Sequence, residues 1–82
     1  MTGSVGPDGY VRSAAEERKL NKLMASVFVG AKGDEALGYI RQITIEAVSG
    51  PDIGQDQLRH LEGMRYLAAI IQRRVTKGRE NE

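Results

Sequence analysis

The strongest constraint on the fold comes from the last third of the chain, where apolar residues recur three and four positions apart. This spacing is followed by Leu61, Met64, Ala68, Ile71 and Val75, and the stripe is flanked by Leu58, Leu67 and Ile70. The period places these side chains on one face of an α-helix, whereas a half-buried strand would alternate every second residue. We therefore predict a helix that begins between Asp52 and Gln57 and runs to about Lys77. Its apolar face is wide enough to pack against two neighbours.

Two further helices are predicted upstream. A capping box at Ser13 and Glu16 opens the first, since each side chain can bond the other residue's backbone N–H. Its apolar stripe continues to Phe28, and a glycine at position 30 is placed to end it. After a loop with the sequence "GAKGD", Asp34 is a good N-cap for the second helix. We expect that helix to continue through the β-branched segment "ITIEAV" until Pro51 stops it.

Three helices joined by short breaks predict an all-α fold, a three-helix hairpin or bundle over residues 13–77. Residues 1–12 hold three glycines and a proline, and we predict a flexible N-terminal arm there. This arm is either a loose end or a segment that orders on a neighbouring subunit. Residues 78–82 are predicted to form a charged tail. A chain of 82 residues buries a modest core, so partner surfaces or oligomerisation become sources of extra stability.

The composition argues against several classes of function. The chain has no cysteine and a single histidine, His60, which excludes a disulfide scaffold and a metal site built from Cys or several His. No glycine-rich stretch has the spacing of a phosphate-binding loop, and no set of acid–base residues is expected to converge. We therefore expect no enzyme, no catalytic residue, no metal and no cofactor. No apolar run approaches about 20 residues, so no membrane partner is expected.

The C-terminal sequence "RRVTKGR" concentrates positive charge in Arg73, Arg74, Lys77 and Arg79. One interpretation is that these cations face the negative end of the helix dipole. The other is that they contact phosphates or an acidic surface of a partner. The net charge of +1, from 12 basic and 11 acidic residues, supplies no whole-molecule field for nucleic-acid binding. DNA contact is therefore the weaker of the two expectations.

Gly63 lies inside the best helix, where glycine costs about 1 kcal/mol relative to alanine. One explanation is a notch where another backbone approaches closely, with Gly38 as the facing notch. The alternative is an exposed position that tolerates glycine. Glu62 can pair at the surface with Arg65 or with Arg59, each of which is three residues away. If that pair is partly buried, it would fix the register between helices.

Two stretches, "VFVGAKGDEALGYIRQITIE" and "LEGMRYLAAIIQRRV", resemble the Bbp-nineteen-like phage domain, whose members are small helical proteins of tailed bacteriophages. The resemblance covers roughly residues 27–75. Its three parts are an aromatic before a short break, a glycine followed by an apolar helix, and a Glu-Gly-x-Arg box. The box corresponds here to Glu62, Gly63 and Arg65. The chain departs from the pattern between its second and third predicted helices, where the expected aromatic is missing.

The resemblance implies a virion or head-assembly protein, because such genes lie among portal, scaffold and capsid genes. It implies no catalytic residues, and it favours Gly63 as a packing notch. The expected partners are phage head or portal proteins, with a second copy of the chain as a further candidate. The expected location is the virion, and the host cytoplasm during assembly. Two alternatives stay open: a DNA-binding packaging or regulatory factor that uses the basic residues of the last helix, and a phage-encoded inhibitor of a host protein.

Overall fold

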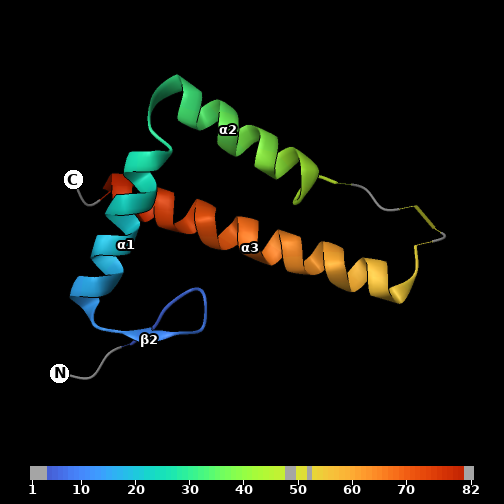
Figure 1. The fold of residues 1–82 in the computed structure, drawn as a ribbon, viewed down its shortest axis with the longest axis horizontal. Coiled ribbons are helices and arrows are strands. Elements are labelled where there is room, and N and C mark those ends of the chain that lie inside the picture. Colours follow the sequence, from blue (N-terminus) through green and yellow to red (C-terminus); the bar gives the residue numbers. More distant parts are fainter. Residues whose placement is uncertain (1–3, 48–49, 52, 81–82) are drawn as a thin grey trace.

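The computed structural model describes residues 4–47, 50–51 and 53–80, and within them the chain forms a small β-hairpin followed by three helices (Figure 1). The hairpin strands are β1 (Ser4–Val5) and β2 (Val11–Arg12), and the helices are α1 (Ala14–Val27), α2 (Gly30–Ile43) and α3 (Gln55–Glu80). The prediction of an all-α fold with three helices, the last one longest, is confirmed.

The three helices are arranged as an open, thin layer. α3 runs along the longest direction of the molecule, α1 crosses its C-terminal end, and α2 runs back beside it (Figure 1). α1 makes most of the helix–helix contacts with α3, whereas α2 touches α3 only sparsely. The chain measures 48 × 34 × 14 Å, with a radius of gyration of 14.9 Å. A compact domain of this length would have a radius of about 12 Å, so the helices do not close into a globule.

The first helix begins as its sequence indicates. Ser13 is the N-cap of α1, and its Oγ accepts a hydrogen bond from the backbone N–H of Glu16 at 3.2 Å. This bond satisfies one of the backbone donors that a helix start leaves unpaired. The predicted start near Ser13 is therefore confirmed.

The predicted loop between the first two helices is wrong, because α2 begins at Gly30 and includes the whole "GAKGD" sequence. Two glycines make this abrupt corner. Gly30 has a φ of +70°, a left-handed conformation that costs glycine nothing. Gly33 lies against the backbone of Phe28, whose carbonyl oxygen would be only 2.7 Å from a Cβ at position 33. The glycines thus bring the two helices together where a loop was expected.

The second helix ends earlier than predicted. α2 stops at Ile43, Thr44 is its C-cap, and residues 44–46 form a turn. The backbone N–H of Glu46 donates to the carbonyl of Arg41 at 2.9 Å, which closes the last turn in place of a continued helix. The rest of the predicted end lies partly outside the described residues, at 48–49 and 52.

The prediction of a flexible N-terminal arm is wrong for residues 4–12. These residues pair as an antiparallel hairpin, with Ser4 opposite Arg12 and Val5 opposite Val11. The turn uses Gly9 at a φ of +87°. A long-range bond holds the hairpin on α3, because the Tyr66 hydroxyl donates to the carbonyl of Pro7 at 3.0 Å. Positions 1–3 of the predicted arm lie outside the described residues.

The predicted charged tail is also largely helical. α3 continues to Glu80, and Gly78 is buried inside it. Residues 81–82 lie outside the described residues. The apolar core among the described residues is small and consists of Ala25, Leu37, Leu61, Ala68 and Val75. Three of these five come from the α3 stripe that the sequence predicted.

Candidate functional site

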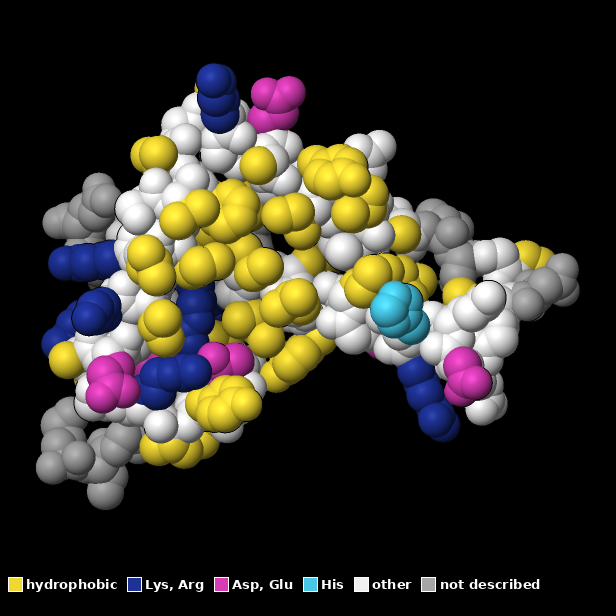
Figure 2. All heavy atoms as spheres, viewed as in Figure 1, with side chains coloured by type: hydrophobic (Ala, Val, Ile, Leu, Met, Phe, Trp, Pro, Cys, Tyr) yellow, Lys and Arg dark blue, Asp and Glu magenta, His cyan; other side chains and the backbone are white. Residues whose placement is uncertain are grey.

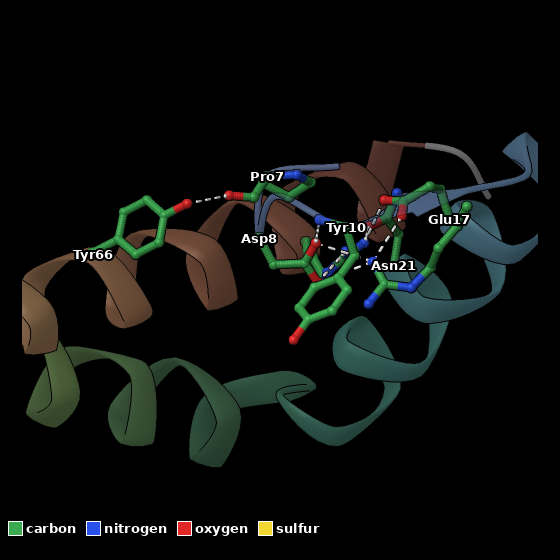
Figure 3. Close-up of polar contacts among 8 residues, drawn as sticks. Pro7, Asp8, Tyr10, Glu17, Asn21 and Tyr66 are labelled. Atoms are coloured by element: carbon green, nitrogen blue, oxygen red, sulfur yellow. Dashed lines mark hydrogen bonds and ion pairs between the residues drawn. The ribbon is translucent and has the colours of Figure 1, made fainter. Parts of the chain in front are cut away.

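A buried polar network joins the hairpin, α1 and the C-terminal half of α3 (Figure 3). At its centre is Arg74, which is 5% exposed. One of its guanidinium nitrogens, Nη1, donates to Glu17 Oε1 at 2.9 Å and to Asn21 Oδ1 at 3.0 Å. The other, Nη2, donates to Asp8 Oδ2 at 3.3 Å. A single side chain therefore connects three elements that are far apart in sequence.

A second cation, Arg12, completes the network from β2. Its Nη1 donates to Asp8 Oδ1 at 3.0 Å and to Glu17 Oε2 at 3.1 Å. Arg12 holds the pKa of Asp8 well below its usual range, helped by the backbone N–H of Tyr10. Arg74 and then Arg12 lower the pKa of Glu17, and Asp8 in turn raises the pKa of Arg12. Two carboxylates thus neutralise two guanidinium groups.

This network is structural, because its groups satisfy one another. Among the described residues, every buried side-chain nitrogen and oxygen has a hydrogen-bond partner. A site that binds a ligand needs polar groups left free to receive it. The hydrogen bonds and ion pairs of the network instead fix the hairpin and α1 onto α3.

The four cations predicted to contact phosphates or an acidic partner do not form one surface patch. Arg74 is buried in the network, which overturns its predicted role at the surface. Arg79 donates to the carbonyl of Phe28 at 2.9 Å and to Asp34 Oδ1 at 2.8 Å, so it ties α3 to the corner between α1 and α2. Arg73 and Lys77 remain exposed, about one helical turn apart.

The Glu-Gly-x-Arg box lies where α3 meets the end of α2. Arg65 donates from Nε to the carbonyl of Thr44 at 3.1 Å and from Nη2 to the carbonyl of Ala47 at 2.5 Å. Glu62 Oε1 accepts from Nη1 of the same side chain at 2.9 Å. Arg65 therefore caps carbonyl groups that the early end of α2 leaves without helical partners. The Glu62–Arg65 pair expected from the sequence forms at the surface, and its arginine fixes the register of α2 on α3.

Gly63 is not a packing notch. A Cβ at Gly63 would meet no atom within 4 Å, and the same holds at Gly38, so the predicted pair of facing notches is wrong. The close approach in α3 is at Gly78, where a Cβ would overlap the carbonyl oxygen of Asn21 and lie 2.7 Å from Ala25 Cβ. The reason is the arrangement of the helices, since α1 crosses the C-terminal end of α3 while α2 stays apart from its middle.

An apolar face covers the side of the molecule seen in Figure 2, where hydrophobic side chains gather over α1, α2 and α3. A groove of about 180 Å³ lies between α2 and α3, lined by Ile40, Thr44, Met64, Leu67, Ala68 and Ile71. A wider open hollow of about 640 Å³ lies along α1, with Leu20 and Leu23 in its wall beside Lys19 and Lys22. Large apolar side chains that remain exposed on the helices are Leu23, Val27, Tyr39, Ile43, Leu58, Tyr66 and Leu67.

The extent of exposed surface is unusual for a chain of this mass. The accessible surface is 6107 Å² for 9.0 kDa, whereas a compact folded monomer of that mass exposes about 4,900 Å². The excess is roughly 1,200 Å² by the same relation. Large apolar patches on a folded chain mark surfaces that bind proteins or other apolar partners. The apolar face is therefore the candidate functional site. The feature of the sequence that indicated it is the wide apolar stripe of α3.

Other kinds of site are not formed by the described residues. In residues 4–47, 50–51 and 53–80, no three or more His, Cys, Asp or Glu side chains are grouped so that they could hold a metal ion. Nor does any described helix combine the length and apolar composition needed to cross a bilayer. No family model, no curated protein and no solved structure matches this chain.

Proposed function

We propose that this chain is a non-enzymatic assembly protein that acts by binding other proteins through its apolar face. The observation that carries this proposal is the set of large apolar side chains that stay exposed on α1, α2 and α3, while only five apolar residues are buried among the described residues. The polar network and the Arg65 cap keep the helices in place beneath this face.

The resemblance to the Bbp-nineteen-like phage domain supports a more specific role. On that basis we infer a structural or assembly protein of a tailed bacteriophage, located in the virion and in the host cytoplasm during assembly. Its partners would be head or portal proteins. Arg65 supports the idea that the box is an architectural feature of such proteins, because it joins the second helix to the third.

A DNA-binding packaging or regulatory factor is the main alternative. It depended on four cations near the end of the last helix, and two of these, Arg74 and Arg79, are engaged in internal contacts. Arg73 and Lys77 remain to meet phosphates, and a protein that contacts few phosphates binds DNA weakly at physiological salt. A phage-encoded inhibitor of a host protein would use the same apolar face. The location of the protein therefore distinguishes an inhibitor from an assembly protein.

Mass spectrometry of purified virions tests the proposal directly. We expect the chain to be found in virions of the phage that encodes it, at a constant ratio to the portal or capsid protein. Its absence from virions and from head-assembly intermediates would contradict the assembly role and favour a regulator or an inhibitor. A gel-shift assay at two ionic strengths addresses the DNA alternative, for which tight binding that weakens steeply with salt is required.

A further inference from the structure

The groove between α2 and α3 is the best-defined part of the apolar face. Ile40 and Thr44 of α2 line one side, and Met64, Leu67 and Ile71 of α3 line the other. None of the six lining residues carries a charge. Leu67 is 58% exposed, although it belongs to the apolar stripe that the sequence marks for burial. The fold therefore forms an apolar groove between α2 and α3 and leaves it exposed.

The α3 side of the groove lies on one side of that helix. Met64, Leu67 and Ile71 are spaced three and four residues apart, so they lie on the same side of α3. Figure 2 shows hydrophobic side chains gathered over α1, α2 and α3 on one face of the molecule.

We propose that a second copy of this chain covers the apolar face, so that the protein is a symmetric homodimer. The proposal rests on the proposed function only in treating this face as a protein interface. Its first support is area. The whole chain exposes roughly 1,200 Å² more surface, polar and apolar together, than a compact monomer of its mass. A dimer in which each copy removed that excess would bury about 2,400 Å², the size found in obligate homodimers. A single compact helical domain would have no such surface to bury.

Charge is the second support. In a symmetric dimer the same patch meets itself, so a charge near the two-fold axis would face a like charge. The groove avoids this problem because its lining is uncharged. The chain also carries a net charge of only +1, so two copies repel each other weakly. An acidic protein or a nucleic acid would find no complementary charge in this groove, whereas two copies of the chain can bring their grooves together without like-charge repulsion.

The mass of the purified full-length chain in solution tests the proposal. We expect sedimentation equilibrium at micromolar concentration to give about 18 kDa, twice the 9.0 kDa of one chain. Leu67→Glu should return the mass to that of a monomer, because it places two negative charges in the apolar interface. Leu58→Glu is the matched control, since Leu58 is 40% exposed and lies about half a turn away around α3. This variant should remain dimeric.

Three results would overturn the proposal: a monomer at every concentration, an assembly larger than a dimer, or a dimer that Leu58→Glu breaks and Leu67→Glu does not. Circular dichroism of both variants checks that they fold.

A second measurement does not require a disruptive substitution. The chain has no cysteine, so Leu67→Cys and Leu58→Cys each introduce a single thiol. In one isolated chain position 67 is the more exposed of the two, and its thiol should react faster with a soluble disulfide reagent. In the dimer the order reverses, and the reaction at position 67 accelerates on dilution. A faster reaction at position 67 that is independent of concentration would refute the interface.

These results can be told apart from a failure of the proposed function. A chain that is monomeric when purified but present in virions would refute the homodimer and leave the assembly role standing. A chain that dimerises through Leu67 but is missing from virions would support the homodimer and refute the assembly role.

Discussion

At the scale of single residues, Arg74 is the side chain on which most of the tertiary structure depends. It is the only described residue that hydrogen-bonds the hairpin and α1 at once from α3, through Asp8, Glu17 and Asn21. A buried guanidinium is costly unless its donors are paired. Removing it would leave Asp8 and Glu17 with Arg12 as their one cationic donor within the network and would take the Arg74 bond from Asn21. Its neighbour Arg73 has the same chemistry at an exposed position.

We expect Arg74→Ala to lower the free energy of unfolding by about 3 kcal/mol, because Glu17, Asn21 and Asp8 lose their shared donor inside the protein. Urea unfolding followed by circular dichroism measures this change. Arg73→Ala is the control, with an expected effect within about 0.5 kcal/mol for an exposed position. Equal effects of the two substitutions would contradict the network.

Because the network contains ionised carboxyl groups, we expect the free energy of unfolding to depend on pH. Folding lowers the pKa of Glu17, so the stability it contributes is complete above its unfolded pKa of about 4.3 and is lost as the pH falls through the lower folded value. We expect Glu17→Gln to cost about 1–2 kcal/mol at pH 7. This difference from the wild type should shrink steadily below about pH 4. Urea unfolding at several pH values provides the measurement.

Glu16→Gln is the control for this prediction. Glu16 is exposed and forms no ion pair within the described residues, so its stability difference should stay small throughout. A Glu17→Gln difference that grows on acidification would show that the sign of the linkage is wrong.

At the scale of helices, glycines decide where two backbones can meet. Gly30 and Gly33 allow α2 to begin directly after α1, and Gly78 allows α1 to cross α3. Gly63, which looks anomalous in the sequence, touches nothing that needs the missing Cβ. Two glycines in the same helix therefore have opposite roles.

Alanine substitutions in α3 separate these roles. Gly78→Ala should destabilise the protein by about 1–3 kcal/mol, because its methyl group would overlap the Asn21 carbonyl and force α1 outward. Gly63→Ala should stabilise it by about 0.5–1 kcal/mol, since alanine is the better helix former and the space is open. Thermal unfolding of both variants measures the difference. A stabilised Gly78→Ala variant would mean that α1 does not cross at this position.

The end of α2 depends on a side chain from another helix. We expect Arg65→Ala to cost about 1–3 kcal/mol, because the Ala47 carbonyl loses its donor and the Thr44 carbonyl keeps only the backbone N–H of Ala47. Hydrogen exchange should become faster at the last turn of α2 while the amides of α1 remain protected. Glu62→Ala, which removes only the exposed partner of Arg65, should change stability by about 0.5 kcal/mol or less. Unchanged exchange in α2 would argue against the cap.

At the scale of the whole molecule, the chain covers too little of its own apolar surface. α2 and α3 lie side by side with an open groove between them, and only the end of α3 is crossed by α1. Stable domains bury their apolar faces between two packed layers. The homodimer supplies the second layer to the part of this molecule that lacks it.

Linked folding and association make thermal stability depend on concentration. We expect the Tm of the wild-type chain to rise as its concentration is increased, because binding of a second copy stabilises the folded state. The Tm of Leu67→Glu should stay constant over the same range. Differential scanning calorimetry at several concentrations measures both. A wild-type Tm that does not change with concentration would contradict dimerisation.

Local patterns in the sequence were sufficient for the number and order of the helices. The Ser13 cap, the spacing of apolar residues in α3 and its start near Gln55 all depend on interactions within a few residues, and all are found in the structure. The wide apolar stripe of α3 also indicated that this helix packs against two neighbours. Gly78 could have been recognised as a packing position, because it continues the buried spacing of Ala68 and Val75.

The sequence by itself therefore determined the number and order of the helices, the Ser13 cap and the apolar face of α3, because these depend on residues that are close along the chain. The tertiary structure alone decided which carbonyls after α2 Arg65 binds and which arginine is buried. Each of these depends on a contact between residues 18 or more positions apart, such as Arg65 with Ala47 or Arg74 with Glu17. No periodicity along the chain encodes such a pair, because the partner is chosen by how the helices cross.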